Sequence, residues 1–185
     1  MRLFVALPLP TGVQDELGPL QEGVAAADWT EPDDLHLTLR FVGDWPVHLL
    51  VPLQQALDRL AEPAFDLGLR RVGFFPPRGQ PHSLWAGVSH EPALLRLQAH
   101  VDAVVAGLGG GRDPRQFSPH VTLGRLRHRP GRTVDAGEVA SWLAQWSTWT
   151  GPAWEVDQVV LYQSGIGSGG GGYVPLHTVW LGSGR

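Results

Sequence analysis

The hydrophobic pattern of this chain alternates between the two-residue period of strands and the three-to-four-residue period of helices. Five apolar residues between 94 and 108 fall on one helical face, Pro92 suits a first helical turn, and the glycines at 109–111 suit an end. This spacing predicts a helix over residues 92–108. Further predicted helices cover residues 11–25 and 138–146, with a helical leucine repeat over 49–60. Predicted strands cover residues 2–8, 35–42, 65–74, 84–88, 154–162 and 173–181.

The tetrapeptide His-x-Thr-Leu occurs twice, at residues 36–39 and 120–123, each time within an apolar, strand-like run. A strand turns alternate side chains to one face, so His36 and Thr38 project together, as do His120 and Thr122. The motifs lie 84 residues apart, and each follows a predicted strand and helix and precedes another helix. This order predicts an internal duplication, in which two lobes related by a pseudo-twofold axis bring both motifs to one cleft.

A single His-x-Thr in a strand is more often structural than functional, but two copies with the same parity favour a function. The unperturbed pKa of histidine, about 6.5, allows one imidazole to act as a base while a second, protonated one acts as an acid. The other six histidines show no zinc-like spacing. We therefore predict acid–base catalysis by His36 and His120 with no metal and no cofactor. If the motifs were coincidental, these two residues would lie far apart in the fold.

Composition narrows the class of protein. The 185 residues are 43% hydrophobic, enough for the core of one domain or of two small lobes. The chain contains no cysteine, which excludes disulfides and thiolate chemistry and fits a reducing, cytoplasmic location. No stretch has the length of a membrane span, and the first residues read better as a strand than as a signal peptide.

Charge limits how the protein could bind nucleic acid. The net charge of −4 argues against a protein that coats RNA, so any RNA contact is expected to be local. All 14 basic residues are arginine, whose planar guanidinium suits phosphate oxygens. Six of them surround the second motif, namely Arg112, Arg115, Arg125, Arg127, Arg129 and Arg132. This cluster leaves two alternatives open, contacts along a longer RNA or neutralisation of a single phosphate.

Several segments resemble the 2H phosphoesterases, and within them the RNA 2′,3′-cyclic phosphodiesterases that are also called 2′-5′ RNA ligases (LigT or ThpR). The similar segments are RLFVA at 2–6, HLTLRFVG at 36–43, LWAGV at 84–88, FSPHVTLGR at 117–125 and LYQS at 161–164, followed by a glycine-rich loop and Tyr173. The resemblance covers most of the chain. It implies a single domain over residues 1–185 with a bilobal α+β fold. In this fold, two antiparallel sheets with outer helices flank a central cleft, and each pseudo-symmetric lobe carries one motif.

The resemblance also implies a reaction, the hydrolysis of RNA 2′,3′-cyclic phosphate ends to 2′-phosphates. Opening the ring by in-line attack of water needs a base on one side of phosphorus and an acid on the other. We assign His36 as the acid that protonates the leaving 3′ oxygen and His120 as the base that activates water, and the sequence leaves the reverse order open. Thr38 and Thr122 are expected to donate to the non-bridging oxygens. The reverse reaction would form a 2′-5′ linkage without ATP.

Four further residues are candidates for binding substrate. Arg125 matches a phosphate-binding arginine of the family, although strict alternation points it away from the motif histidine unless the strand bulges at the neighbouring glycine. Arg40 shares the parity of the first motif, so it either lines the cleft or faces solvent. Phe41 and Tyr173 are candidates to stack on a base, the alternative being a place in the core.

The expected partner is RNA with a 2′,3′-cyclic phosphate end or a related nucleotide, and we expect a monomer that binds no membrane. Two alternatives remain open. The first keeps both histidines and acts as a phosphodiesterase on a small cyclic nucleotide. The second is a non-catalytic module that binds a nucleotide, which the intact histidines of both motifs disfavour.

Overall fold

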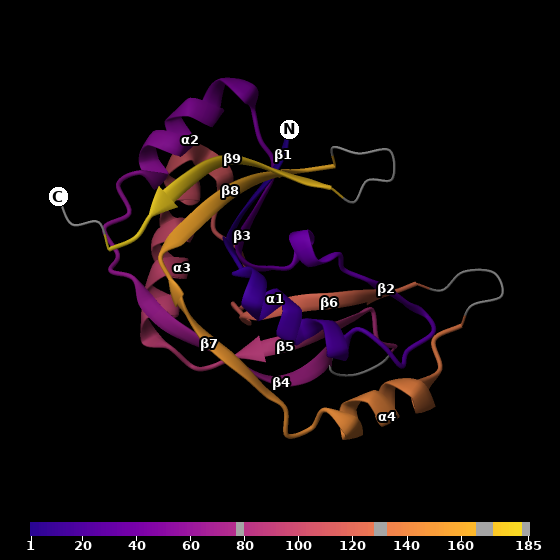
Figure 1. Ribbon diagram of the computed structural model, residues 1–185. Coiled ribbons are helices and arrows are strands. Elements are labelled where there is room, and N and C mark those ends of the chain that lie inside the picture. The colour runs from indigo at the N-terminus through magenta and orange to yellow at the C-terminus, as the bar shows by residue number, and fades with distance from the viewer. Residues whose placement is uncertain (77–79, 128–132, 166–171, 183–185) are drawn as a thin grey trace.

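The computed structural model of the chain describes residues 1–76, 80–127, 133–165 and 172–182. Within these residues the fold is α+β, with nine strands and four α-helices (Figure 1). The strands are β1 (Arg2–Pro8), β2 (Ala27–Trp29), β3 (His36–Asp44), β4 (Phe65–Phe75), β5 (Ser83–Val88), β6 (His120–Leu126), β7 (Thr150–Val156), β8 (Gln158–Ser164) and β9 (Tyr173–Trp180). The helices are α1 (Thr11–Leu17), α2 (Leu50–Leu57), α3 (Pro92–Val105) and α4 (Ala136–Gln145).

The strands pair antiparallel throughout, in the order β7-β4-β5-β6-β3-β1-β8-β9, and β2 adds to β6. We predicted two separate sheets, but the described strands form one connected sheet, because the two motif strands β3 and β6 pair with each other. Figure 1 shows this junction in the middle of the molecule, with β8 and β9 above it and β4 and β5 below. The sheet therefore continues beyond β3 with β1, β8 and β9, and beyond β6 with β5, β4 and β7. The internal duplication itself stays a prediction.

The helices bury apolar stripes against this sheet and against each other. Helix α3 packs on β3 and on α2, and its Leu94, Leu97 and Val101 are fully buried. The predicted helix over 92–108 ends early, at Val105, where a wider turn over Ala106–Gly110 begins. Gly109 closes this turn at a φ of 95°, which a side chain would strain. Among the described helices, none combines the length and the apolar character of a membrane span.

Two further predicted elements need correction, and one strand was not predicted. The helix expected over 11–25 ends at Leu17, because a Gly18–Leu20 turn containing Pro19 follows it. The strand expected over 154–162 is two strands that separate at Asp157, β7, which pairs with β4, and β8, which pairs with β1. Strand β2 was not predicted, since three residues are too few to show a period.

Candidate active site

The two motifs meet where β3 pairs with β6. Leu37 of the first motif lies directly opposite Val121 of the second in an antiparallel register, and both side chains are fully buried. Residues opposite each other in such a pair point to the same face, and their neighbours along each strand point to the other. The half-buried side chains of His36, Thr38, His120 and Thr122 therefore share one face of the sheet, called here the motif face. The large separation that coincidental motifs would show is therefore not found.

Both imidazole rings are held in the same way. The Nδ1 of His36 lies 2.7 Å from the carbonyl oxygen of Asp34, and the Nδ1 of His120 lies 2.7 Å from the carbonyl oxygen of Ser118. A carbonyl oxygen only accepts, so Nδ1 carries the proton in both rings. Each neutral ring therefore keeps the lone pair of its Nε2 for a ligand, and each protonated ring has an Nε2 proton to donate.

The surroundings favour the neutral form of both histidines. Burial lowers the pKa of His36, the hydrogen bond to Asp34 opposes this, and the positive charges of His120 and Arg125 lower the pKa further. Burial also lowers the pKa of His120, against the hydrogen bond to Ser118, and Arg125 adds to the lowering. The two rings and the guanidinium of Arg125 are thus within electrostatic reach of one another. An anion placed among them would raise both pKa values.

Each histidine also packs against aromatic rings. The ring of His36 lies 4.9 Å from Phe4 and 5.1 Å from Tyr173, measured between centroids, and Tyr162 stacks on Phe4 at 5.1 Å. The ring of His120 lies 4.8 Å from Phe75, edge to face. These contacts restrict the orientation of both imidazoles.

Sequence reasoning did not assign the rings of Phe4, Tyr162, Phe75 and Trp85 to the site. Trp85 lies 6.4 Å from the ring of His120 and pairs with Thr122 across the strands, and Phe4 pairs with Phe41 in the same way. Cross-strand pairing was the signal that could have found them, and it requires the strand order to be known.

A bulge decides where Arg125 points. On β6, Thr122 and Gly124 pair with adjacent residues of β5, so Leu123 is an extra residue. The carbonyl oxygen of Leu123 accepts from the backbone N–H of Thr30 at 2.8 Å and from the side chain of Gln21 at 2.9 Å. The bulge shifts the alternation of side chains between the two faces by one residue, so Arg125 returns to the motif face. There the exposed Arg125 acts electrostatically on both histidines. A Cβ at Gly124 would lie 2.7 Å from the Trp29 ring, so this position also requires glycine for packing.

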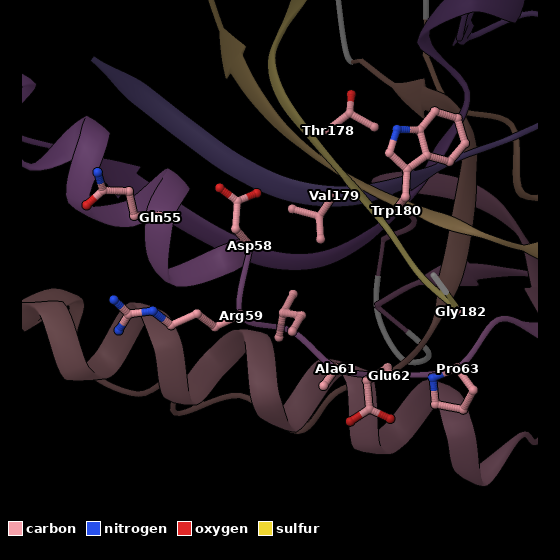
Figure 2. Close-up of a pocket in the computed structure, with 11 residues that line it drawn as sticks. Gln55, Asp58, Arg59, Ala61, Glu62, Pro63, Thr178, Val179, Trp180 and Gly182 are labelled. Carbon is pink, nitrogen blue, oxygen red and sulfur yellow. The ribbon is translucent and has the colours of Figure 1, made fainter. Parts of the chain in front are cut away.

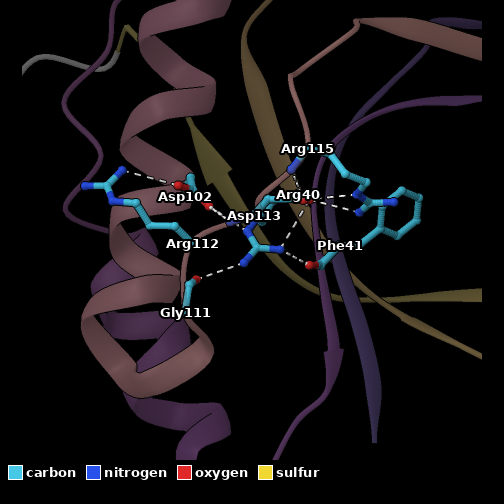
Figure 3. A network of polar contacts seen from close by, with 7 residues as sticks. All are labelled: Arg40, Phe41, Asp102, Gly111, Arg112, Asp113 and Arg115. Carbon is cyan, nitrogen blue, oxygen red and sulfur yellow. Dashed lines mark hydrogen bonds and ion pairs between the residues drawn. The ribbon is translucent and has the colours of Figure 1, made fainter.

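The first motif carries an equivalent bulge, which overturns the parity argument for Arg40. Thr38 and Arg40 pair with adjacent residues of β1, so Leu39 is extra. Arg40 consequently lies on the helix side of the sheet, 7% exposed, and its Nε donates to Asp102 of α3 at 2.7 Å. Its other nitrogens contact the carbonyl oxygens of Gly111 and Phe41 (Figure 3). Arg40 neither lines the motif face nor faces solvent.

We expect replacement of Arg40 by leucine to lower the free energy of unfolding by about 3 kcal/mol, because the buried carboxylate of Asp102 loses its principal partner. Chemical denaturation measures this difference. The matched control is Arg112→Gln, which removes an exposed partner of the same carboxylate and is expected to cost less than about 1 kcal/mol. Equal effects of the two substitutions would contradict a structural role that is specific to Arg40.

The structure places the remaining predicted residues in different environments. Phe41 follows the bulge of β3 and is 49% exposed, whereas Tyr173 is half-buried against His36. Three arginines of the cluster pair with carboxylates: Arg112 with Asp102, Arg115 with Asp113 and Arg127 with Asp28. In the described part of the chain Arg125 has no such pair, and Arg129 and Arg132 lie outside the described residues. Among the described arginines of the cluster, Arg125 is therefore the one that acts on both motif histidines and has no carboxylate partner.

Two further observations bear on the location of the site. A cavity of about 1270 Å³ lies between the end of α2 and β9, where Asp58, Glu62 and Trp180 are among its lining residues (Figure 2). It contains none of the motif residues, so side-chain chemistry rather than cavity size locates the candidate site. Among the described residues, no group of three or more His, Asp or Glu side chains is arranged to hold a metal ion.

Comparison with known proteins agrees with this geometry. The sequence model of the family described as LigT like Phosphoesterase matches residues 7–85 and 87–170. An RNA 2′,3′-cyclic phosphodiesterase of Archaeoglobus fulgidus is 32% identical over 138 residues, which cover 73% of this chain and 78% of that protein. One of Thermus thermophilus is 36% identical over 139 residues, which cover 69% of each. Among solved structures, E. coli LigT complexed with 3′-AMP gives a TM-score of 0.77 at 26% identity, with 97% of each chain covered. A Thermus thermophilus protein gives 0.80 at 31% identity over the full length of both chains.

Proposed function

Because the chain belongs to the LigT-like phosphoesterases, enzymes of the 2H phosphoesterase type, we propose that it hydrolyses RNA 2′,3′-cyclic phosphate ends to 2′-phosphates by two-histidine acid–base catalysis. The observation that carries the proposal is the common face of the two His-x-Thr pairs at the β3–β6 junction, with both Nδ1 atoms held by backbone carbonyls. The names of the relatives and the 3′-AMP complex of E. coli LigT support a nucleotide substrate.

The proposed mechanism follows from the free Nε2 atoms. One neutral imidazole takes a proton from the attacking water, and the second, protonated imidazole gives its Nε2 proton to the leaving 3′ oxygen. We assign His120 as the base and His36 as the acid. The charge of Arg125 and the hydroxyl groups of Thr38 and Thr122 stabilise the negative charge that builds on the non-bridging oxygens. With a 5′-hydroxyl end in place of water as the nucleophile, the same groups join that end to the phosphorus in a 2′-5′ linkage, and the 3′ oxygen leaves with a proton from the acid.

The test uses an oligonucleotide that ends in a 2′,3′-cyclic phosphate, incubated with the purified protein in EDTA. The expected result is conversion to a 2′-phosphate end at the same rate with and without the chelator. Binding without turnover would contradict the proposal and favour the nucleotide-binding alternative. Both motifs come from one chain, so a monomer is expected to be active, which size-exclusion chromatography of the active fraction checks. The cytoplasmic location stays a prediction.

We expect Thr38→Val and Thr122→Val each to lower kcat by about 100-fold, because valine keeps the shape of threonine but removes the donor to the transition state. Steady-state kinetics on the same oligonucleotide measures the change. The control is Thr178→Val, which removes an exposed hydroxyl on β9, three strands away from β3, and should not alter kcat. Losses below about 3-fold in both motif variants would contradict the proposed role of the hydroxyls.

A further inference from the structure

An arginine and an aromatic ring form a platform beside the motif face. The guanidinium carbon of Arg115 lies 5.6 Å from the centroid of the exposed Phe41 ring. Phe41 lies 6.3 Å from Phe4, which in turn lies 4.9 Å from the ring of His36. One aromatic ring therefore separates this platform from a motif histidine.

The guanidinium of Arg115 is oriented before any ligand arrives. Its Nε and Nη2 donate to the two carboxylate oxygens of Asp113 at 3.0 and 2.9 Å. Asp113 is positioned in turn by Arg40 at 3.5 Å and by its own N–H, which donates to Asp102. The side-chain hydrogen bond from Arg115, its backbone N–H, and the charges of Arg115 and Arg40 lower the pKa of Asp113 to about 2, although burial opposes this. The carboxylate therefore stays ionised and holds the arginine throughout the neutral range (Figure 3).

This network carries one positive charge more than its negative charges compensate, and Arg115 keeps a donor group without a partner among the described residues. Three guanidinium groups, those of Arg40, Arg112 and Arg115, face two carboxylates, those of Asp102 and Asp113. Arg40 is buried, whereas the Arg115 side chain is 67% exposed. Its third nitrogen, Nη1, has no partner among the described residues and retains two hydrogens for an anion. Arg112 is equally exposed but lies at the far end of the network, away from Phe41 (Figure 3).

We propose that Arg115 binds the phosphodiester group on the 5′ side of the terminal nucleotide, with Phe41 supporting the guanidinium. The inference rests on the proposed function, because that function places the cyclic phosphate among the motif side chains. The pre-oriented guanidinium still has the hydrogens of Nη1 to donate to phosphate oxygen. A single contact of this kind agrees with the local RNA binding expected of a chain with a net charge of −4. Arg115 thereby distinguishes an RNA end from a free cyclic mononucleotide.

The test compares adenosine 2′,3′-cyclic phosphate with a dinucleotide that ends in the same group and adds one internal phosphodiester. We expect the wild-type protein to have the higher kcat/KM for the dinucleotide, and Arg115→Gln to lower the dinucleotide-to-mononucleotide ratio by about 10-fold. The salt dependence of kcat/KM for the dinucleotide should become shallower by about 0.7 in log–log slope, the value for one phosphate contact on a single strand. Arg112→Gln is the matched control and should change neither ratio nor slope.

Three outcomes would overturn the inference. An equal loss on both substrates in Arg115→Gln would mean that the arginine only supports the fold of the site. An unchanged ratio and slope would mean that the internal phosphate does not contact it. If the wild-type protein hydrolyses neither substrate, the proposed function fails together with the inference. If it hydrolyses both but Arg115→Gln changes neither the ratio nor the slope, only the proposed subsite fails.

Discussion

Replacement of His36 or of His120 by alanine is expected to lower the rate constant for cyclic-phosphate hydrolysis by about 1,000-fold in each case. In the proposed mechanism the two rings act at opposite ends of the same displacement, so the loss of either one leaves the reaction without its base or its acid. The double variant should therefore be little slower than either single variant, because residues that act as a unit are not additive. Single-turnover kinetics, with separation of the 2′-phosphate product, measures these rates without interference from product release.

The control for these variants is His48→Ala, which removes an exposed imidazole ahead of α2 and should leave the rate unchanged. Circular dichroism and a denaturation curve show whether each variant is folded. A loss below about 10-fold in either motif variant would exclude the two-histidine mechanism. Multiplicative losses in the double variant would show that the two rings act independently, against the proposed concerted displacement.

The period of two in the strands was sufficient to predict which motif side chains point together. Residues 36 and 38, and residues 120 and 122, share a face in the sequence and in the structure, because no irregularity interrupts either pair. The long helix α3 was also predictable, since a packed apolar stripe and a glycine-rich end leave a clear pattern. Patterns of this kind depend only on residues that are close together in the sequence, so the sequence is sufficient to predict them.

The features that required the structure all depend on the partner strand. Nothing distinguishes Leu39 and Leu123 from other strand leucines, yet both are the extra residue of a bulge that pairing with β1 and β5 creates. Strict alternation therefore directed Arg40 to the wrong side of the sheet. The separation of β7 from β8 at Asp157 was missed for a related reason. Apolar residues continue within two positions on both sides of the break, at Val156 and Val159, and only the pairing with β4 and β1 separates the strands.

The two bulges lie at equivalent positions of the motifs, but the residues that follow them differ. In each motif the extra leucine follows the threonine, so the second residue after that leucine returns to the motif face. This residue is Phe41 in the first motif and Arg125 in the second. We infer that a bound cyclic nucleotide meets an aromatic surface beside His36 and a cation beside His120. The different neighbours agree with different roles for two histidines held in the same way.

Replacement of Arg125 by glutamine is expected to lower kcat/KM by about 100-fold, because the motif face loses its cation toward the phosphate. The substitution should also shift the pH profile. Burial, together with the charge of Arg125, keeps the pKa values of both histidines below their usual value of about 6.5 in the free protein. A histidine acid with a lowered pKa loses its proton at lower pH, so the alkaline limb of wild-type kcat/KM should lie below about pH 6.5.

The Arg125→Gln substitution removes a positive charge that lowers the pKa values of both histidines. The alkaline limb of kcat/KM should therefore move to higher pH, while the maximum value of kcat/KM falls. Bound anionic substrate raises the same pKa values, and the limb of kcat should therefore lie at higher pH than that of kcat/KM in the wild-type protein. Arg127→Gln is the control, since Arg127 pairs with Asp28 at 3.4 Å and is not among the charges that shift either histidine pKa. A shift of the limb to lower pH in Arg125→Gln, or an equal shift in the control, would contradict the electrostatic role assigned to Arg125.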